Sequence, residues 1–190
     1  MVVGLTGGIG SGKTTVARIF EKLGIPIYNS DQRAKDLYSE SQELKTLMQA
    51  HFGTDIYTGN EINRSMLANI VFGNKAELEV LNGFVHPLLQ KDFEYWNEKQ
   101  NAPYVLREAA ILIESGAHKF CDKIIVITAD EEVRIARVTK RDNSTKEQVK
   151  SRMANQLKDS ERLKFADFEI KNNTNDSLIE QVLHIHSQLK

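Results

Sequence analysis

Residues 7–14 read Gly7-Gly8-Ile9-Gly10-Ser11-Gly12-Lys13-Thr14. This stretch fits the pattern G-x-x-x-x-G-K-[ST] of a loop that wraps around phosphate groups. A short apolar run at residues 1–5 precedes it, and residues 15–23 carry apolar side chains at helical spacing. A buried strand, a glycine-rich turn and a helix start are the context that this loop requires. The alternative is a glycine-rich turn that binds nothing, and the presence of both Lys13 and Thr14 disfavours it.

The loop predicts where a nucleoside triphosphate would bind. Backbone N–H groups and the positive end of the following helix would face the anion. Lys13 would reach the outer phosphates, and the Thr14 hydroxyl would ligate Mg²⁺. The expected nucleotide-binding residues of this stretch are Gly8, Ile9, Gly10, Ser11, Gly12, Lys13, Thr14 and Thr15.

Strand and helix patterns alternate along the rest of the chain. Short apolar runs near residues 27–28, 103–108, 123–128 and 167–170 are typical of strands, and helical patterns separate them. Such alternation predicts an α/β fold with three α/β/α layers and a five-stranded parallel sheet. Residues 75–99 have a helical pattern that Pro87 should kink or interrupt.

Composition narrows the class of protein. The chain has 190 residues and a net charge of −1, so no basic field favours nucleic acid as a partner. No apolar run approaches the ~20 residues of a membrane span, and the run before the loop lacks the basic leader of a signal peptide. The single Cys121 excludes an internal disulfide. We therefore expect a cytoplasmic protein.

The phosphate loop alone fits a GTPase, a motor ATPase or a small-molecule kinase. A GTPase would carry Asn-Lys-x-Asp late in the sheet, and residues 128–132 lack it. Glu108 ends the third strand, but no acidic pair of the kind found in motor ATPases accompanies it. Glu108 is either a water-mediated Mg²⁺ ligand or an ordinary strand-end charge. The pattern favours a kinase.

Cations that could close over a transferring phosphoryl group follow the fourth strand. Arg134, Arg137 and Arg141 are spaced i, i+3, i+7 and share one helix face. They form either a solvated basic stripe or a set of phosphate-binding guanidinium groups, and their place after this strand favours the second interpretation.

Asp31 is the candidate base for a kinase. It follows the second strand, at the carboxyl edge of the sheet where open α/β folds bind ligands. In phosphoryl transfer such a carboxylate mostly orients the acceptor hydroxyl and takes its proton late. The alternative role is that of a helix cap, and one carboxylate can serve both.

Several segments together resemble the dephospho-CoA kinase family. Besides the phosphate loop they are, in chain order, Asn29-Ser30-Asp31, Ile62-Asn63-Arg64, Leu81-Asn82-Gly83-Phe84-Val85-His86-Pro87, Ala110-Ile111-Leu112-Ile113-Glu114-Ser115-Gly116, Arg137-Val138-Thr139-Lys140-Arg141-Asp142, Arg152-Met153-Ala154-Asn155-Gln156 and Ala166-Asp167-Phe168-Glu169-Ile170-Lys171-Asn172. The resemblance covers almost the whole chain. The His-Pro and Glu-Ser-Gly elements are more specific than the loop.

The resemblance implies ATP-dependent, Mg²⁺-supported phosphorylation of the ribose 3′-hydroxyl of dephospho-CoA, giving CoA and ADP. It also implies three parts: a nucleotide-binding core of residues 1–30, 101–141 and 166–190, a helical CoA-binding insertion of residues 31–100, and a lid of residues 142–165.

The resemblance further assigns roles to individual residues. Lys13, Asp31 and Arg141 would be catalytic, and Arg137 and Asn172 would bind the nucleotide. The residues expected to contact the acceptor are Asp31, Arg64, His86, Glu114 and Arg152. His86 is otherwise a structural histidine, and Glu114 otherwise the cap of a short helix.

Four positions depart from the family pattern. Asn29 replaces an acid, so the base role rests on Asp31 alone; Ala110 replaces a proline, Arg162 a lysine and Lys35 a frequent histidine. None removes a group that the chemistry requires. Two other functions stay open: another small P-loop kinase acting on a nucleoside or nucleotide, and a non-catalytic ATP-binding regulatory protein. We expect a monomer or a weak homo-oligomer.

Overall fold

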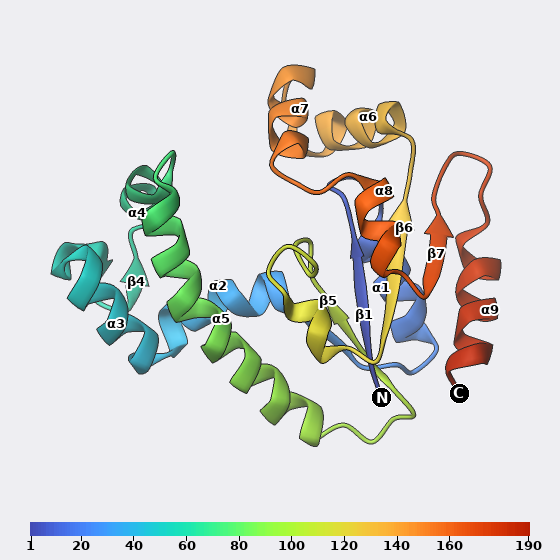
Figure 1. The fold of residues 1–190 in the computed structure, drawn as a ribbon, viewed down its shortest axis with the longest axis horizontal. Coiled ribbons are helices and arrows are strands. Elements are labelled where there is room, and N and C mark those ends of the chain that lie inside the picture. The colour runs from blue at the N-terminus through green and yellow to red at the C-terminus, as the bar shows by residue number, and fades with distance from the viewer. The chain divides into compact units, whose positions relative to one another are not determined.

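The computed structural model describes residues 1–190, drawn in Figure 1. The chain forms two compact units. The first consists of residues 1–29 and 100–190, and the second of residues 30–99.

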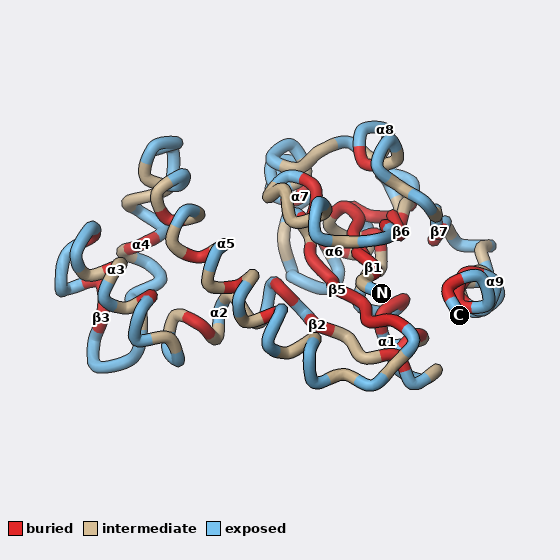
Figure 2. The backbone as a smooth tube through the Cα atoms, turned by 60° about the horizontal axis from the view of Figure 1, so that its bottom comes forward, coloured by how far each residue is buried: buried red, intermediate tan, exposed pale blue.

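A five-stranded sheet forms the centre of the first unit. Its strands are β1 (Val2–Gly7), β2 (Ile27–Asn29), β5 (Val105–Glu108), β6 (Lys123–Thr128) and β7 (Phe168–Lys171). They pair in the order β2-β5-β1-β6-β7, and every pair is parallel. The central strands are buried, as Figure 2 shows in red, and this explains their nearly continuous apolar sequences. The predicted five-stranded parallel sheet is confirmed.

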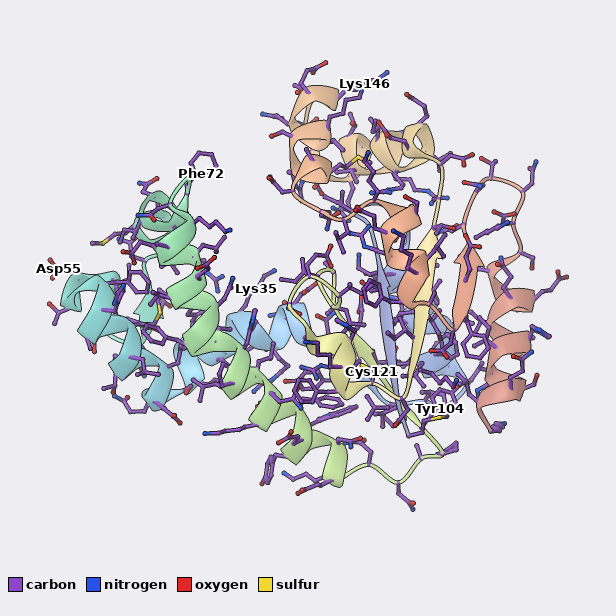
Figure 3. All side chains as sticks on the ribbon, viewed as in Figure 1. Lys35, Asp55, Phe72, Tyr104, Cys121 and Lys146 are labelled. Carbon is purple, nitrogen blue, oxygen red and sulfur yellow. The ribbon has the colours of Figure 1, made fainter.

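Two helices cover the hydrophobic core beside this sheet. They are α1 (Lys13–Lys22) and α9 (Leu178–Leu189). Phe20 of α1 and Val182 of α9 are fully buried in one cluster with residues of the strands. Tyr104, labelled in Figure 3, belongs to the same cluster and hydrogen-bonds to the buried His186 of α9. Burial lowers the pKa of His186, so its neutral form prevails in the folded protein.

Three further helices lie between β6 and β7 in the chain. They are α6 (Glu131–Asp142), α7 (Lys146–Ala154) and the short α8 (Asp159–Arg162), and Figure 1 shows α6 and α7 above the sheet. Asn143 ends α6 in the left-handed conformation, with φ 50°. A capping box of Thr145 and Gln148 then begins α7. Lys146 on its first turn points outward in Figure 3.

The second unit is mostly helical. It contains α2 (Ser30–Glu40), α3 (Gln42–Phe52), α4 (Arg64–Val71) and α5 (Lys75–Glu98). Arg33 of α2 makes a two-pronged ion pair with Asp92 of α5, with its Nη2 2.8 Å from the carboxylate. No helix of the protein combines the length and the apolar character needed to cross a bilayer.

Two features of this unit differ from the sequence prediction. Helix α5 continues through Pro87, so the expected interruption is wrong. Because Pro87 has no N–H group, the carbonyl oxygen of Gly83 lacks its usual partner within the helix. The space beside the Gly83 Cα is open. A hairpin of β3 (Tyr57–Thr58) and β4 (Glu61–Ile62) was not predicted, because two-residue strands leave no periodic pattern.

Candidate active site

The phosphate loop joins β1 to α1. Strand β1 lies at the centre of the sheet, and the chain continues to β2 and β5 on one side of it and to β6 and β7 on the other. Ligands bind at such a switch point in open α/β folds, outside the carboxyl ends of the strands. Helix α1 begins at Lys13, so its positive end faces the loop.

Asn172 supports the loop from the end of β7. Its Nδ2 donates to the carbonyl oxygen of Ser11 at 2.7 Å, and its Oδ1 accepts from Arg137 at 3.3 Å. Gly12 has φ 100°, and a Cβ there would collide with the Asn172 amide. Two residues expected to bind nucleotide therefore lie beside the loop and contact each other.

The side chains that should meet phosphate and metal lie on the same turn. Lys13 donates through Nζ to the carbonyl oxygen of Gly7 at 2.8 Å. Thr14 and Thr15 are exposed at the start of α1. The buried Ser11 hydroxyl has no hydrogen-bond partner.

An open pocket of about 930 Å³ adjoins the loop. Its lining includes the expected nucleotide-binding residues Thr15, Arg137 and Asn172, together with apolar side chains of α1, α6 and α9. A pocket of mixed polar and apolar lining suits a nucleoside.

The three arginines of α6 fall into two kinds of environment. Arg134 is buried, donates through Nε to the carbonyl oxygen of Ile9 at 3.0 Å and pairs through Nη1 with Asp159 at 3.0 Å. Arg141 is exposed and forms two hydrogen bonds to Asp142. The single basic face expected from the spacing is therefore divided.

Arg141 and Arg152 share one carboxylate. Arg152 of α7 donates to Asp142 at 2.7 Å, and the two guanidinium groups hold the pKa of Asp142 well below its usual range. Arg141, expected to be catalytic, and Arg152, expected to contact the acceptor, thus lie next to each other at the α6–α7 turn.

Glu114 follows β5 and forms an ion pair rather than a cap. Its Oε1 accepts from Arg162 at 3.0 Å and from the backbone N–H of Leu157 at 3.2 Å. Arg162 is completely buried and also pairs with Asp159. Glu114 therefore ties the segment after β5 to α8.

Glu108 and Asn29 meet at the ends of neighbouring strands. The Asn29 amide donates to the Glu108 carboxylate at 3.0 Å, and Glu108 is buried. The amide that replaces the family's first acid thus serves as a hydrogen-bond donor to Glu108.

The expected acceptor-side residues Asp31, Arg64 and His86 belong to the second unit. Asp31 lies in the first turn of α2, which begins at Ser30, so Asp31 is inside the helix and not its cap. Arg64 begins α4, and His86 lies in the middle of α5.

A pocket of about 300 Å³ lies within the second unit and contains Arg64. Its lining residues are Lys35, Tyr38, Ser39, Glu61, Ile62 and Arg64. Burial raises the pKa of Tyr38, and the charge of Arg64 opposes that rise. The phenol is therefore a neutral donor at ordinary pH.

Sequence reasoning missed Asp142, Asp159 and the role of Gln156. Gln156 accepts from the backbone N–H of Ile9 at 2.8 Å. Gln156 is the last residue of the segment 152–156 that resembles the family, so the sequence did point to it. Asp159 lies outside the quoted segments. Its partner Arg134 is on another helix, and its partner Arg162 is three residues further along α8.

The parallel sheet with a Lys-Thr phosphate loop after its central strand defines the class of P-loop proteins that bind nucleoside triphosphates. The sequence profile of the dephospho-CoA kinase family matches residues 1–177. The dephospho-CoA kinase of Fusobacterium nucleatum is 40% identical and that of Mannheimia succiniciproducens 36% identical; the matches cover 92% and 98% of this chain and 91% and 90% of the relatives.

A solved structure of dephospho-CoA kinase from Campylobacter jejuni superimposes with a TM-score of 0.69 at 27% identity, covering 99% of this chain and 96% of that one. The chain belongs to the dephospho-CoA kinase family, a family of enzymes that phosphorylate dephospho-CoA in coenzyme A biosynthesis. The family assignment based on sequence resemblance is confirmed.

Proposed function

We propose that this protein transfers the γ-phosphoryl group of ATP to the ribose 3′-hydroxyl of dephospho-CoA, giving CoA and ADP. The observation that carries the proposal is the phosphate loop at the switch point, with Lys13 and Thr14 in place and a pocket beside it. The roles proposed for the ATP-binding residues and for the acceptor-binding residues follow from the contacts that these residues make.

The donor side holds ATP. Loop N–H groups bind the phosphates, except those of Ile9 and Ser11, which donate to Gln156 and to the Gly8 carbonyl oxygen. Lys13 exchanges its bond to the Gly7 carbonyl oxygen for the β- and γ-phosphates. The adenosine occupies the pocket beside Thr15, where Arg137 and Asn172 contact it. Binding of this kind lowers the barrier mainly by positioning and by charge stabilisation.

Thr14 is the proposed protein ligand of Mg²⁺. Its hydroxyl is exposed on the first turn of α1, and Mg²⁺ usually takes only one or two protein ligands besides phosphates and water. The chain has no cluster of three His, Cys, Asp or Glu side chains suited to a metal, which agrees with such a sparse site. When bound, the ion supplies charge that neutralises the phosphate oxygens.

Residues 31–100 form the proposed CoA-binding part. Asp31, two residues after β2, orients the acceptor hydroxyl and receives its proton. The pocket at Arg64 offers two cations, a neutral phenol and one carboxylate, and its excess of positive charge suits a phosphate-bearing ligand. His86 lies near the centre of α5 and shapes the acceptor site.

Residues 142–165 form the proposed lid over a core of residues 1–30, 101–141 and 166–190. Arg141 and Arg152 leave Asp142 for the transferring phosphoryl group, where they stabilise its charge and exclude water. Glu114 contributes to the acceptor side through the lid segment that it contacts. We further propose a cytoplasmic enzyme that is a monomer or a weak homo-oligomer.

The acceptor decides between this function and its rivals. ATP is incubated with dephospho-CoA, nucleosides and nucleoside monophosphates, and ADP release is measured. We expect release with dephospho-CoA and a product phosphorylated at the 3′ position. Preference for a nucleoside monophosphate would favour another small kinase, and tight ATP binding without transfer would favour a regulatory protein.

The base role is tested by Asp31→Asn. The amide keeps the shape of the side chain but cannot take the proton, so kcat should fall at least ~10²-fold. ATP affinity should stay within about twofold, since the change leaves the phosphate loop intact. Near-normal turnover would show that Asp31 serves only the start of α2.

A further inference from the structure

Ile9, the third residue of the phosphate loop, is held at three points. Its N–H donates to Gln156 Oε1 at 2.8 Å, and its carbonyl oxygen accepts from Arg134 Nε at 3.0 Å. Its side chain packs against a small apolar cluster of α6 and α7 made by Ile135, Val138, Val149 and Met153.

Arg134 is itself fixed. Its side chain is 9% exposed, and its guanidinium lies against Gly8, where a Cβ would collide with it. Asp159 accepts from Arg134 at 3.0 Å through one oxygen and from Arg162 at 3.1 Å through the other. These partners hold the Arg134 side chain against the loop.

The N–H of Ile9 belongs to the Gly8–Ile9 peptide and its C=O to the Ile9–Gly10 peptide, so neither of these two peptide groups can rotate without breaking a hydrogen bond. The peptides on either side of Ile9 set the direction of the next N–H groups in the loop. A phosphate loop binds through the direction of those groups, so a pre-arranged loop loses less free energy on binding than a mobile one.

We propose that Arg134 and Gln156 are positioning residues for the triphosphate of ATP. They act through Ile9, and Asp159 acts through Arg134. The segment after α7 thus keeps the loop ready to bind phosphate. This inference rests on the proposed binding of ATP at the loop.

The first test removes the acceptor at Gln156. Gln156→Met keeps the length of the side chain but cannot accept from Ile9. In the full-length protein, dissociation constants are measured for Mg-ATP by calorimetry and for adenosine by NMR titration. We expect Mg-ATP to bind roughly fivefold more weakly, the effect of one hydrogen bond, and adenosine to bind unchanged. Gln188→Met, an exposed change on α9, is the matched control.

The second test uses Arg134→Lys, with Arg18→Lys on the exposed face of α1 as its control. Lysine keeps the charge but cannot donate to Ile9 and Asp159 in the same fork-like geometry. We expect Mg-ATP to bind roughly tenfold more weakly, again without change for adenosine. In the double variant the two losses should be less than additive, because they act on the two adjacent peptide groups that flank Ile9.

The outcomes separate the possibilities. Unchanged Mg-ATP binding in Gln156→Met would overturn the inference. Equal weakening of Mg-ATP and adenosine would also overturn it, because general loosening of the fold predicts that result. If the wild-type protein binds Mg-ATP no better than adenosine, the proposed binding of the triphosphate by the loop is itself contradicted.

Discussion

Both ends of helix α6 carry an arginine, but the two side chains differ in burial and in hydrogen-bond partners. Arg134 near the start is 9% exposed and bonded to the loop, whereas Arg141 at the end is 62% exposed and bonded only to the neighbouring Asp142. Arg137 lies between them and contacts both Gly10 and Asn172. A shared helix face therefore does not imply an equal role. The inner end shapes the site, and the outer end is free to exchange its partner.

The largest expected effect is a loss of turnover when the arginine at the outer end of α6, Arg141, is replaced. Arg141→Met should lower kcat about 10²-fold, because one charged donor to the phosphoryl group is lost. The melting temperature should hardly change, since an exposed ion pair contributes little stability. Steady-state kinetics and a thermal melt check both parts, with the exposed neighbour variant Lys140→Met as the control. An unchanged kcat would reduce Arg141 to a solvated surface charge.

A smaller effect is expected from the buried ion pairs behind the inner end. Glu114→Gln leaves the fully buried Arg162 with one carboxylate instead of two, and the free energy of unfolding should fall by about 2 kcal/mol. Urea denaturation measures it, with the exposed Glu21→Gln of α1 as the control. A higher KM for dephospho-CoA at full stability would instead assign Glu114 to direct contact with the acceptor.

The smallest effect sharpens the comparison at the outer end. Asp142 competes with the phosphates for Arg141 and Arg152, so Asp142→Asn should bind Mg-ATP about two- to fivefold more tightly. First Arg141 and then Arg152 hold the pKa of Asp142 low. The Asp142 carboxylate is therefore charged at every pH above its usual pKa range, and it becomes protonated only in strong acid. The gain should therefore be constant from pH 6 to 9 in a binding titration, and a gain that varies over this range would contradict the competition.

The sheet and the phosphate loop were predictable because local patterns encode them. Buried parallel strands have continuous apolar sequences, and the loop pattern depends on the backbone of eight adjacent residues. Helix α5 was predicted to be kinked or interrupted at Pro87. It continues, because the one missing hydrogen bond costs less than the packing of Leu81, Val85, Leu89 and Phe93 recovers.

The contacts around the loop were not predictable in the same way. Ile9 and Gln156 are 147 residues apart, and Arg134 and Asp159 are 25 apart. Spacing on one helix showed that the arginines share a face, but it carried no information about which carboxylate each would meet. Tertiary packing decides that, so the division of the basic face appears only in the folded chain.

The glycines of the loop have a consequence for how such proteins diverge. The space beside Gly8 is filled by Arg134, and the space beside Gly12 by Asn172. Selection for folding alone would thus retain both glycines in a descendant that had lost its catalytic activity. Their survival would be a poor mark of a working enzyme. The residue to inspect in such a descendant is Thr14, whose side chain is exposed at the start of α1.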